Sequence, residues 1–144
     1  MKVETFHQKL NEPRVVFAIQ EAERKTSGEI RVLISKRKIE DPVSEAQKVF
    51  LRERMDQTAE RNGVLILISP RSQKYAVIGD QGITERVGNR FWEEIVSSIG
   101  IYFKNEDFTT GVVEAIEKIG ESLAIHFPRK NNDQNELNNE VIRD

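Results

Sequence analysis

The sequence predicts an α/β domain in which a small mixed β-sheet carries helices on both faces. Residues 29–35 alternate in character and are rich in β-branched side chains, which is typical of a strand. Residues 64–69 form a continuous apolar run, which indicates a strand that is covered on both sides. Apolar residues at helical spacing in the flanking segments predict the helices that supply this cover.

The first half of the chain predicts two helices and two strands. A helix over residues 12–25 has Pro13 in its first turn, where the missing N–H costs nothing. After the strand at 29–35, Asp41 and Pro42 are typical of the start of a second helix, which we expect to run to about Arg61. The strand at 64–69 follows, and residues 70–73 turn the chain into its hairpin partner at 74–79.

The second half predicts two helices and a polar tail. Residues 83, 87, 91, 95 and 99 are apolar, which favours a third helix with Thr84 as its N-cap. A fourth helix is expected from Asp107 to Phe127, where Pro128 stops it. Residues 129–144 are too polar to bury a face, so we expect them to be disordered. The predicted fold is a three-layer α/β/α sandwich formed by residues 1–128.

Composition limits the classes of function. The 144 residues have a net charge of -2 and no basic stripe, which argues against nucleic-acid binding. The absence of cysteine excludes thiol catalysis and thiolate metal sites, and fits a cytoplasmic protein. No apolar run is long enough to span a bilayer, and no signal peptide is visible at the start of the chain. We expect a monomer.

Several segments in this order are similar to the TPM-domain family. They are residues 26–30, 55–58, 61–65, 78–83 and 103–108. The chain looks like a short, soluble bacterial-type member of this family, which also includes a thylakoid-lumen acid phosphatase linked to photosystem II repair. The resemblance implies a helix-flanked sheet over residues 1–128. It also implies that the protein shares the divalent-cation binding and phosphate-ester hydrolysis of some members.

The candidate site follows from the expected directions of the strands. If the strands at 29–35 and 64–69 are parallel and the strand at 74–79 is antiparallel, the start of the first strand and the turn after the third lie at one sheet end. The polar residues expected there are Glu29, Asp56, Asn62 and Asp80, with Arg61 beside them. Carboxylate and amide oxygens suit Ca²⁺ or Mg²⁺, so we predict a cation held by these four residues.

Structural alternatives remain open for Asp80, Glu29, Asp56 and Arg61. Asp80 stands in a Gly-Asp-Gln-Gly turn, where an aspartate commonly bonds to its own backbone. Arg61 could clamp a phosphate or form an ion pair with Glu29 or Asp80. Asp56 could be a solvated residue on an exposed helix face.

These residues are consistent with two functions. In the first, a cation on Asp80, with help from Glu29 or Asp56, polarises a phosphate-containing small molecule, and Arg61 neutralises developing charge. In the second, the domain is a non-catalytic module that binds a cation and a protein partner. The resemblance implies a role for such a module in membrane-protein assembly or repair.

Overall fold

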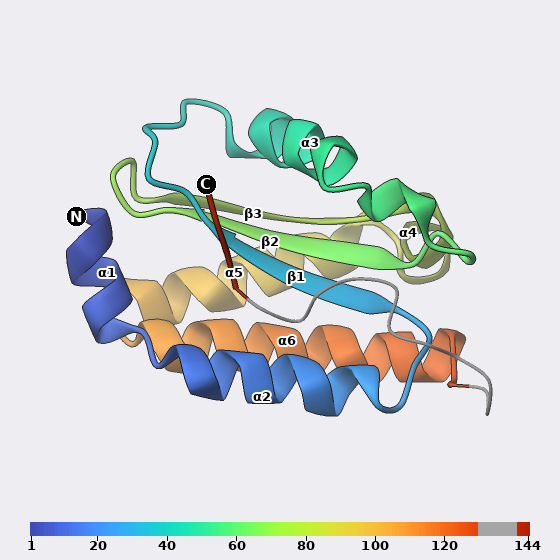
Figure 1. Ribbon diagram of the computed structural model, residues 1–144. Helices are drawn as coiled ribbons and strands as arrows, with labels where there is room; N and C mark the ends of the chain where they lie inside the picture. Colours follow the sequence, from blue (N-terminus) through green and yellow to red (C-terminus); the bar gives the residue numbers. More distant parts are fainter. Residues whose placement is uncertain (130–140) are drawn as a thin grey trace.

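The computed structural model describes residues 1–129 and 141–144, and it confirms the predicted three-layer sandwich (Figure 1). The sheet has the order β3-β2-β1-β4. Its strands are β1 (Glu29–Ile34), β2 (Gly63–Ser69), β3 (Lys74–Gly79) and β4 (Ile142–Arg143). β1 is parallel to both β2 and β4, whereas β2 and β3 form the expected antiparallel hairpin.

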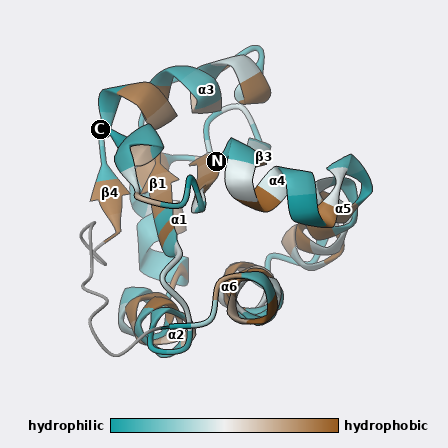
Figure 2. Cartoon of the chain, turned by 90° about the vertical axis from the view of Figure 1, so that its right-hand side faces the viewer, coloured by the Kyte–Doolittle hydropathy of each residue, from teal (hydrophilic) through white to brown (hydrophobic). Residues whose placement is uncertain are grey.

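Six helices and one 3₁₀ turn surround this sheet in the described residues. They are α1 (Val3–Lys9), α2 (Glu12–Glu23), α3 (Pro42–Arg52), η1 (Met55–Gln57), α4 (Gln81–Val87), α5 (Asn89–Lys104) and α6 (Phe108–His126). α3 lies on one face of the sheet, and α2 and α6 lie on the other, with the apolar strand β1 between them (Figure 2). None of the described helices is long and apolar enough to cross a membrane.

Every residue of β2 is buried, as the apolar run predicts. Alternate side chains of β1 and β2 point to opposite faces of the sheet. Leu33, Leu65 and Leu67 pack with Phe50 in the layer under α3. The other residues, such as Ile66, join a larger core with the helices on the opposite face.

The second helix is shorter than predicted. Asp41 caps α3 by accepting a hydrogen bond from the Ser44 N–H at 3.1 Å, but the helix ends at Arg52 instead of Arg61. Arg54 takes a left-handed conformation with φ 57°, which breaks the helical hydrogen bonding. Ala59, which the helical spacing places on a buried face, is exposed in the loop that follows.

The third predicted helix is two helices. Thr84 lies inside α4, so it is not the N-cap residue. Its hydroxyl donates a hydrogen bond back to the Gly79 carbonyl at 3.0 Å. Asp80 is the N-cap residue instead, and its Oδ1 accepts from the Gln81 N–H at 2.8 Å. Gly88, with φ 82°, separates α4 from α5.

Two ordered segments, α1 and β4, were not predicted from the sequence. α1 is anchored by Phe6, which is buried against Phe103 and Phe108. The segment 129–144, predicted to be a disordered tail, is ordered where the structure describes it: the Arg129 N–H donates to the Lys25 carbonyl at 3.1 Å, and the last four residues contain β4. There β4 pairs with Leu33 and Ile34 of β1, and Asp144 accepts hydrogen bonds from Ser35 and Lys36. The part of the tail at 130–140 lies outside the described residues.

Candidate functional site

One end of the sheet gathers the predicted polar residues, as the strand directions require. Glu29 at the start of β1 is in register with Gly63 at the start of β2. Gly79 at the end of β3 pairs with Val64, and the Asp80 N–H donates to the Gly63 carbonyl at 2.9 Å. The N-terminal ends of two parallel strands and the C-terminal end of the hairpin strand therefore meet there.

The central contact of this sheet end is a two-pronged ion pair between Arg61 and Asp80. The Arg61 Nε lies 2.8 Å from Asp80 Oδ2, and Nη2 lies 3.0 Å from Oδ1. Asp80 is only 7% exposed, whereas half of the Arg61 side chain is open to solvent. Two parallel bonds of this kind fix the carboxylate in direction as well as in charge.

Both structural alternatives for Asp80 are thus present in one place. The same carboxylate pairs with Arg61 and caps α4 through Gln81. Of the two ion pairs considered for Arg61, the structure shows the one with Asp80. Hydrogen bonding to Asp80, together with its charge, raises the pKa of Arg61, and the nearby charge of Asp56 adds a smaller effect in the same direction.

Asp56 lies in the 3₁₀ turn η1, on the solvent side of this corner. It is half-buried, and its Oδ2 accepts from the Gln57 side-chain amide at 3.2 Å. Its effect on the Arg61 pKa shows that it shares the electrostatic environment of Asp80. The charge of Asp56 therefore acts, more weakly, on the same guanidinium that pairs with Asp80.

Asn62 is buried directly beneath this corner. Its backbone N–H donates to Thr58 Oγ1 at 3.1 Å, and its side-chain Nδ2 donates to Ser27 Oγ at 3.0 Å. Its Oδ1 is buried and has no hydrogen-bond partner among the described residues. An amide oxygen in this state has a lone pair available for a donor or a cation.

Glu29 faces a partner that the sequence analysis missed. The buried Glu23, in the last turn of α2, lies within hydrogen-bonding reach of Glu29, and its Oε2 accepts from the Ile30 N–H at 2.8 Å. Burial, reinforced by the charge of Glu29, raises the pKa of Glu23 to about 9. Burial and the neighbouring carboxylate therefore favour the protonated form of Glu23. Helical spacing could have indicated that Glu23 is buried, because it follows the buried Ile19 by four residues and so lies on the same helix face.

The two glycines beside Asp80 have packing roles. A Cβ on Gly79 would lie 2.2 Å from Trp92 Cζ2, and one on Gly82 would lie 2.2 Å from the Glu60 carbonyl oxygen. Trp92 is held in turn by a hydrogen bond from its Nε1 to Thr84 Oγ1 at 3.2 Å. Gly79 lets α5 pack closely on the sheet, and Gly82 lets α4 approach the preceding loop. Close packing is therefore enough to explain both glycines, and no ligand is needed to explain them.

A shallow groove of about 380 Å³ opens beside Asp80 along the edge strand β3. Its lining includes Phe50 of α3 and Trp92 of α5, with Asp80 and Thr84 at one end. In the described parts of the chain, no three Asp, Glu, His or Cys side chains come close enough together to hold a metal ion. Both Asp80 oxygens accept hydrogen bonds from Arg61, so a cation at this carboxylate would compete with the guanidinium for the same oxygen atoms.

These features define a small α/β sandwich whose polar sheet end is closed by an aspartate–arginine pair. The chain belongs to the TPM-domain family, whose sequence model, described as TPM domain, matches residues 8–122. It is also similar to the BA42 protein of the psychrophilic bacterium Bizionia argentinensis, known from an NMR structure. The two chains are 39% identical, the match covers 92% of each, and the TM-score is 0.84. No curated protein matches this chain.

Proposed function

We propose that this protein binds a divalent cation at Asp80 and hydrolyses phosphate esters there. The observation that carries the proposal is the Asp80–Arg61 pair, a nearly buried carboxylate whose partner is half-exposed and can move into solvent. The matched family carries the name TPM phosphatase, which supports the choice of reaction. The cation would be Ca²⁺ or Mg²⁺, since the oxygen atoms at this corner suit hard ions.

Arg61 and the cation would compete for the Asp80 carboxylate. A cation there would draw on Asp80 first, and on Asp56 second, because the half-buried Asp56 also contributes charge at Arg61. Asn62 Oδ1, which is buried without a partner in the described structure, is a further candidate oxygen. Glu29 is the weakest of the predicted ligands, because it is buried against Glu23. The bound cation would polarise a phosphoryl oxygen, and a released Arg61 could bind the phosphate.

Replacing Arg61 with glycine is expected to strengthen cation binding. Glycine suits the left-handed backbone of this residue, whose φ is 53°, and removes the competing guanidinium. We expect the calcium dissociation constant from isothermal titration calorimetry to fall about tenfold, as loss of one charged hydrogen-bonded competitor allows. Asp80→Asn should abolish the binding.

Arg54→Gly is the matched control for that experiment. It removes the same charge from a residue with a similar φ of 57°, but Arg54 forms no ion pair within the described residues. Calcium affinity should change there by no more than about twofold, as expected for an exposed charge. Equal affinities in the wild type and in Arg61→Gly would show that Arg61 does not compete with the cation.

Catalysis is tested separately with an aromatic phosphate monoester. We expect turnover that requires calcium or magnesium, stops with EDTA and is lost in Asp80→Asn. Arg61→Gly should bind the cation better and yet turn over about 10- to 100-fold more slowly, because the charge that stabilises the transition state is gone. Turnover that survives Asp80→Asn would contradict this assignment of the site.

The non-catalytic module is the second candidate, and one observation favours it. The Asp80 carboxylate accepts bonds from both Arg61 and Gln81, so it is not poised as a nucleophile or base in the arrangement described. Calcium binding that depends on Asp80, without turnover of phosphate esters, would identify the protein as a cation-binding module. The search for a function would then move to a protein partner.

A further inference from the structure

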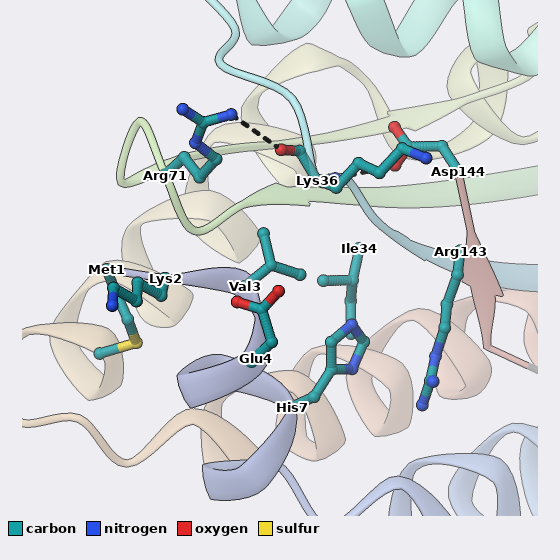
Figure 3. Close-up of a pocket in the computed structure, with 10 residues that line it drawn as sticks. All are labelled: Met1, Lys2, Val3, Glu4, His7, Ile34, Lys36, Arg71, Arg143 and Asp144. Atoms are coloured by element: carbon teal, nitrogen blue, oxygen red, sulfur yellow. Dashed lines mark hydrogen bonds between the residues drawn. The ribbon is translucent and has the colours of Figure 1, made fainter.

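A second pocket lies at the opposite end of the sheet from Asp80. It has a volume of about 690 Å³ and is formed where β1 and β4 end, beside α1 and the turn between β2 and β3 (Figure 3). The parallel strands point their carboxyl ends towards it. In open α/β sheets this is the end of the strands where ligands most often bind.

Positive charge dominates this pocket. Three of its lining cations, Lys2, Lys36 and Arg71, have no carboxylate partner among the described residues, and the Arg71 guanidinium donates only to the Lys36 carbonyl at 3.4 Å. A fourth cation, Arg143, is paired with Glu12. Glu4 is the one lining side-chain carboxylate without an ion-pair partner in the described chain, so positive charge exceeds negative charge among the described lining side chains.

The side-chain carboxylate of Asp144 lies at the rim of the pocket. The Asp144 carboxylate accepts hydrogen bonds from the Ser35 hydroxyl, from the Lys36 N–H at 2.8 Å and from Arg37 Nε at 3.4 Å. Burial alone would raise the pKa of Asp144, but these bonds outweigh it and lower the pKa. Backbone and side-chain donors at the end of β1 therefore stabilise negative charge.

Apolar side chains form part of the pocket lining. Val3 and Ile34 line it together with Met1. The volume falls in the range of pockets that enclose whole small molecules, and it far exceeds the size of an inorganic ion. Lys36 and Arg71 lie to one side of Val3 and Ile34, and Lys2 lies beside Met1 (Figure 3).

We propose that this pocket binds a small organic phosphate, with the phosphate group on Lys36 and Arg71 and the organic group against Val3 and Ile34. The inference does not depend on the function proposed for Asp80, because the two sites lie at opposite ends of the sheet and this one uses cationic side chains. Flexible lysine and arginine side chains are suited to phosphate, which accepts charge-assisted hydrogen bonds on several oxygens.

The test is an amide titration of the isotope-labelled full chain with AMP in the presence of EDTA, which keeps any metal site empty. We expect saturable shifts at residues 34–37, Arg71 and 141–144. Inorganic phosphate and adenosine, which each carry half of the proposed ligand, should each bind at least about tenfold more weakly. Equal binding of AMP and inorganic phosphate would overturn the claim of an organic ligand.

The double variant Lys36→Gln with Arg71→Gln is expected to weaken AMP binding at least about tenfold, through loss of two charged contacts. Lys48→Gln with Arg52→Gln is its matched control. It removes the same two charges from exposed positions on α3, across the sheet from the pocket, and should leave the affinity within about twofold. Equal losses in both double variants, or shifts confined to residues 79–85, would overturn the proposal.

Discussion

Gly82→Ala is expected to destabilise the protein by about 3 kcal/mol, one of the largest effects of a single methyl group in this chain. The new Cβ would lie 2.2 Å from the Glu60 carbonyl oxygen and 2.6 Å from that of Arg61. Both neighbours are backbone atoms, and the Gly82 N–H also donates to the Arg61 carbonyl at 2.8 Å. Relief of the clash therefore requires α4 to move away from the loop, with loss of that hydrogen bond.

Thermal unfolding measures this effect, and Gly100→Ala is its control. A Cβ at Gly100 in α5 would also meet an atom closely, at 2.5 Å, but that atom is the hydroxyl at the far end of the Tyr75 side chain. Tyr75 can shift, and alanine favours the helix, so Gly100→Ala should change stability by less than about 1 kcal/mol. Gly82→Ala should lower the melting temperature by roughly 10 °C.

This result would also decide why the glycine is there. If Gly82 were needed only to let a bound ion approach the backbone, Gly82→Ala would have the melting temperature of the wild type. Its calcium affinity would be the only property to fall. The packing explanation requires the loss of stability to occur in metal-free protein. The same distinction applies to Gly79, whose added Cβ would meet the ring of Trp92. A glycine-rich turn beside an aspartate is thus consistent with close helix packing as well as with a ligand site.

The central strands of the sheet could be predicted from the sequence, because a strand that is buried on both faces appears as a continuous run of apolar residues. The apolar run of β2 and the position of Glu29 and Asp80 at one sheet end followed from strand direction alone. The short elements had no comparable signal. β4 contains two residues, Ile142 and Arg143, which is too few for any periodicity, and its pairing with β1 depends on tertiary contacts.

The helix break at Gly88 shows a different limit. Ile83, Val87 and Ile95 keep the same four-residue spacing through the break, so periodicity predicts one helix where there are two. The conformation of Gly88, with φ 82° and ψ 165°, is one that glycine alone adopts readily. The residue type therefore carried the information that the apolar pattern did not.

The partners of the site residues were the hardest to predict. Opposite charge alone would allow Glu29 and Arg61 to pair. In the fold, Arg61 forms an ion pair with Asp80, and Glu29 lies next to Glu23. Which of these contacts forms depends on where α2 ends relative to β1. Glu23 was missed because an acidic residue on an apolar helix face does not contribute to the hydrophobic pattern.

Glu23→Gln is expected to stabilise the protein at alkaline pH and to flatten its dependence on pH. The pKa of Glu23 is about 9 in the folded state and near 4.5 when unfolded, so the folded protein holds an extra proton between these values. Its stabilising effect is complete below pH 4.5 and is lost as pH rises towards 9. Glutamine is neutral throughout, can still accept from the Ile30 N–H and can donate to Glu29.

Denaturant unfolding between pH 5 and 9 measures this prediction. The variant should match the wild type near pH 5 and exceed it by of the order of 3 kcal/mol at pH 8. Glu21→Gln is the control on the same helix, where the exposed pair with Arg24 at 3.4 Å contributes about 0.5 kcal/mol at most. Parallel stability curves for the wild type and Glu23→Gln would show that Glu23 is ionised in the folded protein.

The protonation of Glu23 also separates two places where a cation could bind. A cation at Glu29 would disfavour the neighbouring proton and release it, so its affinity would rise steeply between pH 6 and 8. A cation at Asp80 and Asp56 would displace Arg61, whose raised pKa keeps it charged over that range, and its affinity would hardly change. Calcium titrations of the wild type and of Glu23→Gln across these pH values therefore decide which carboxylates serve as ligands.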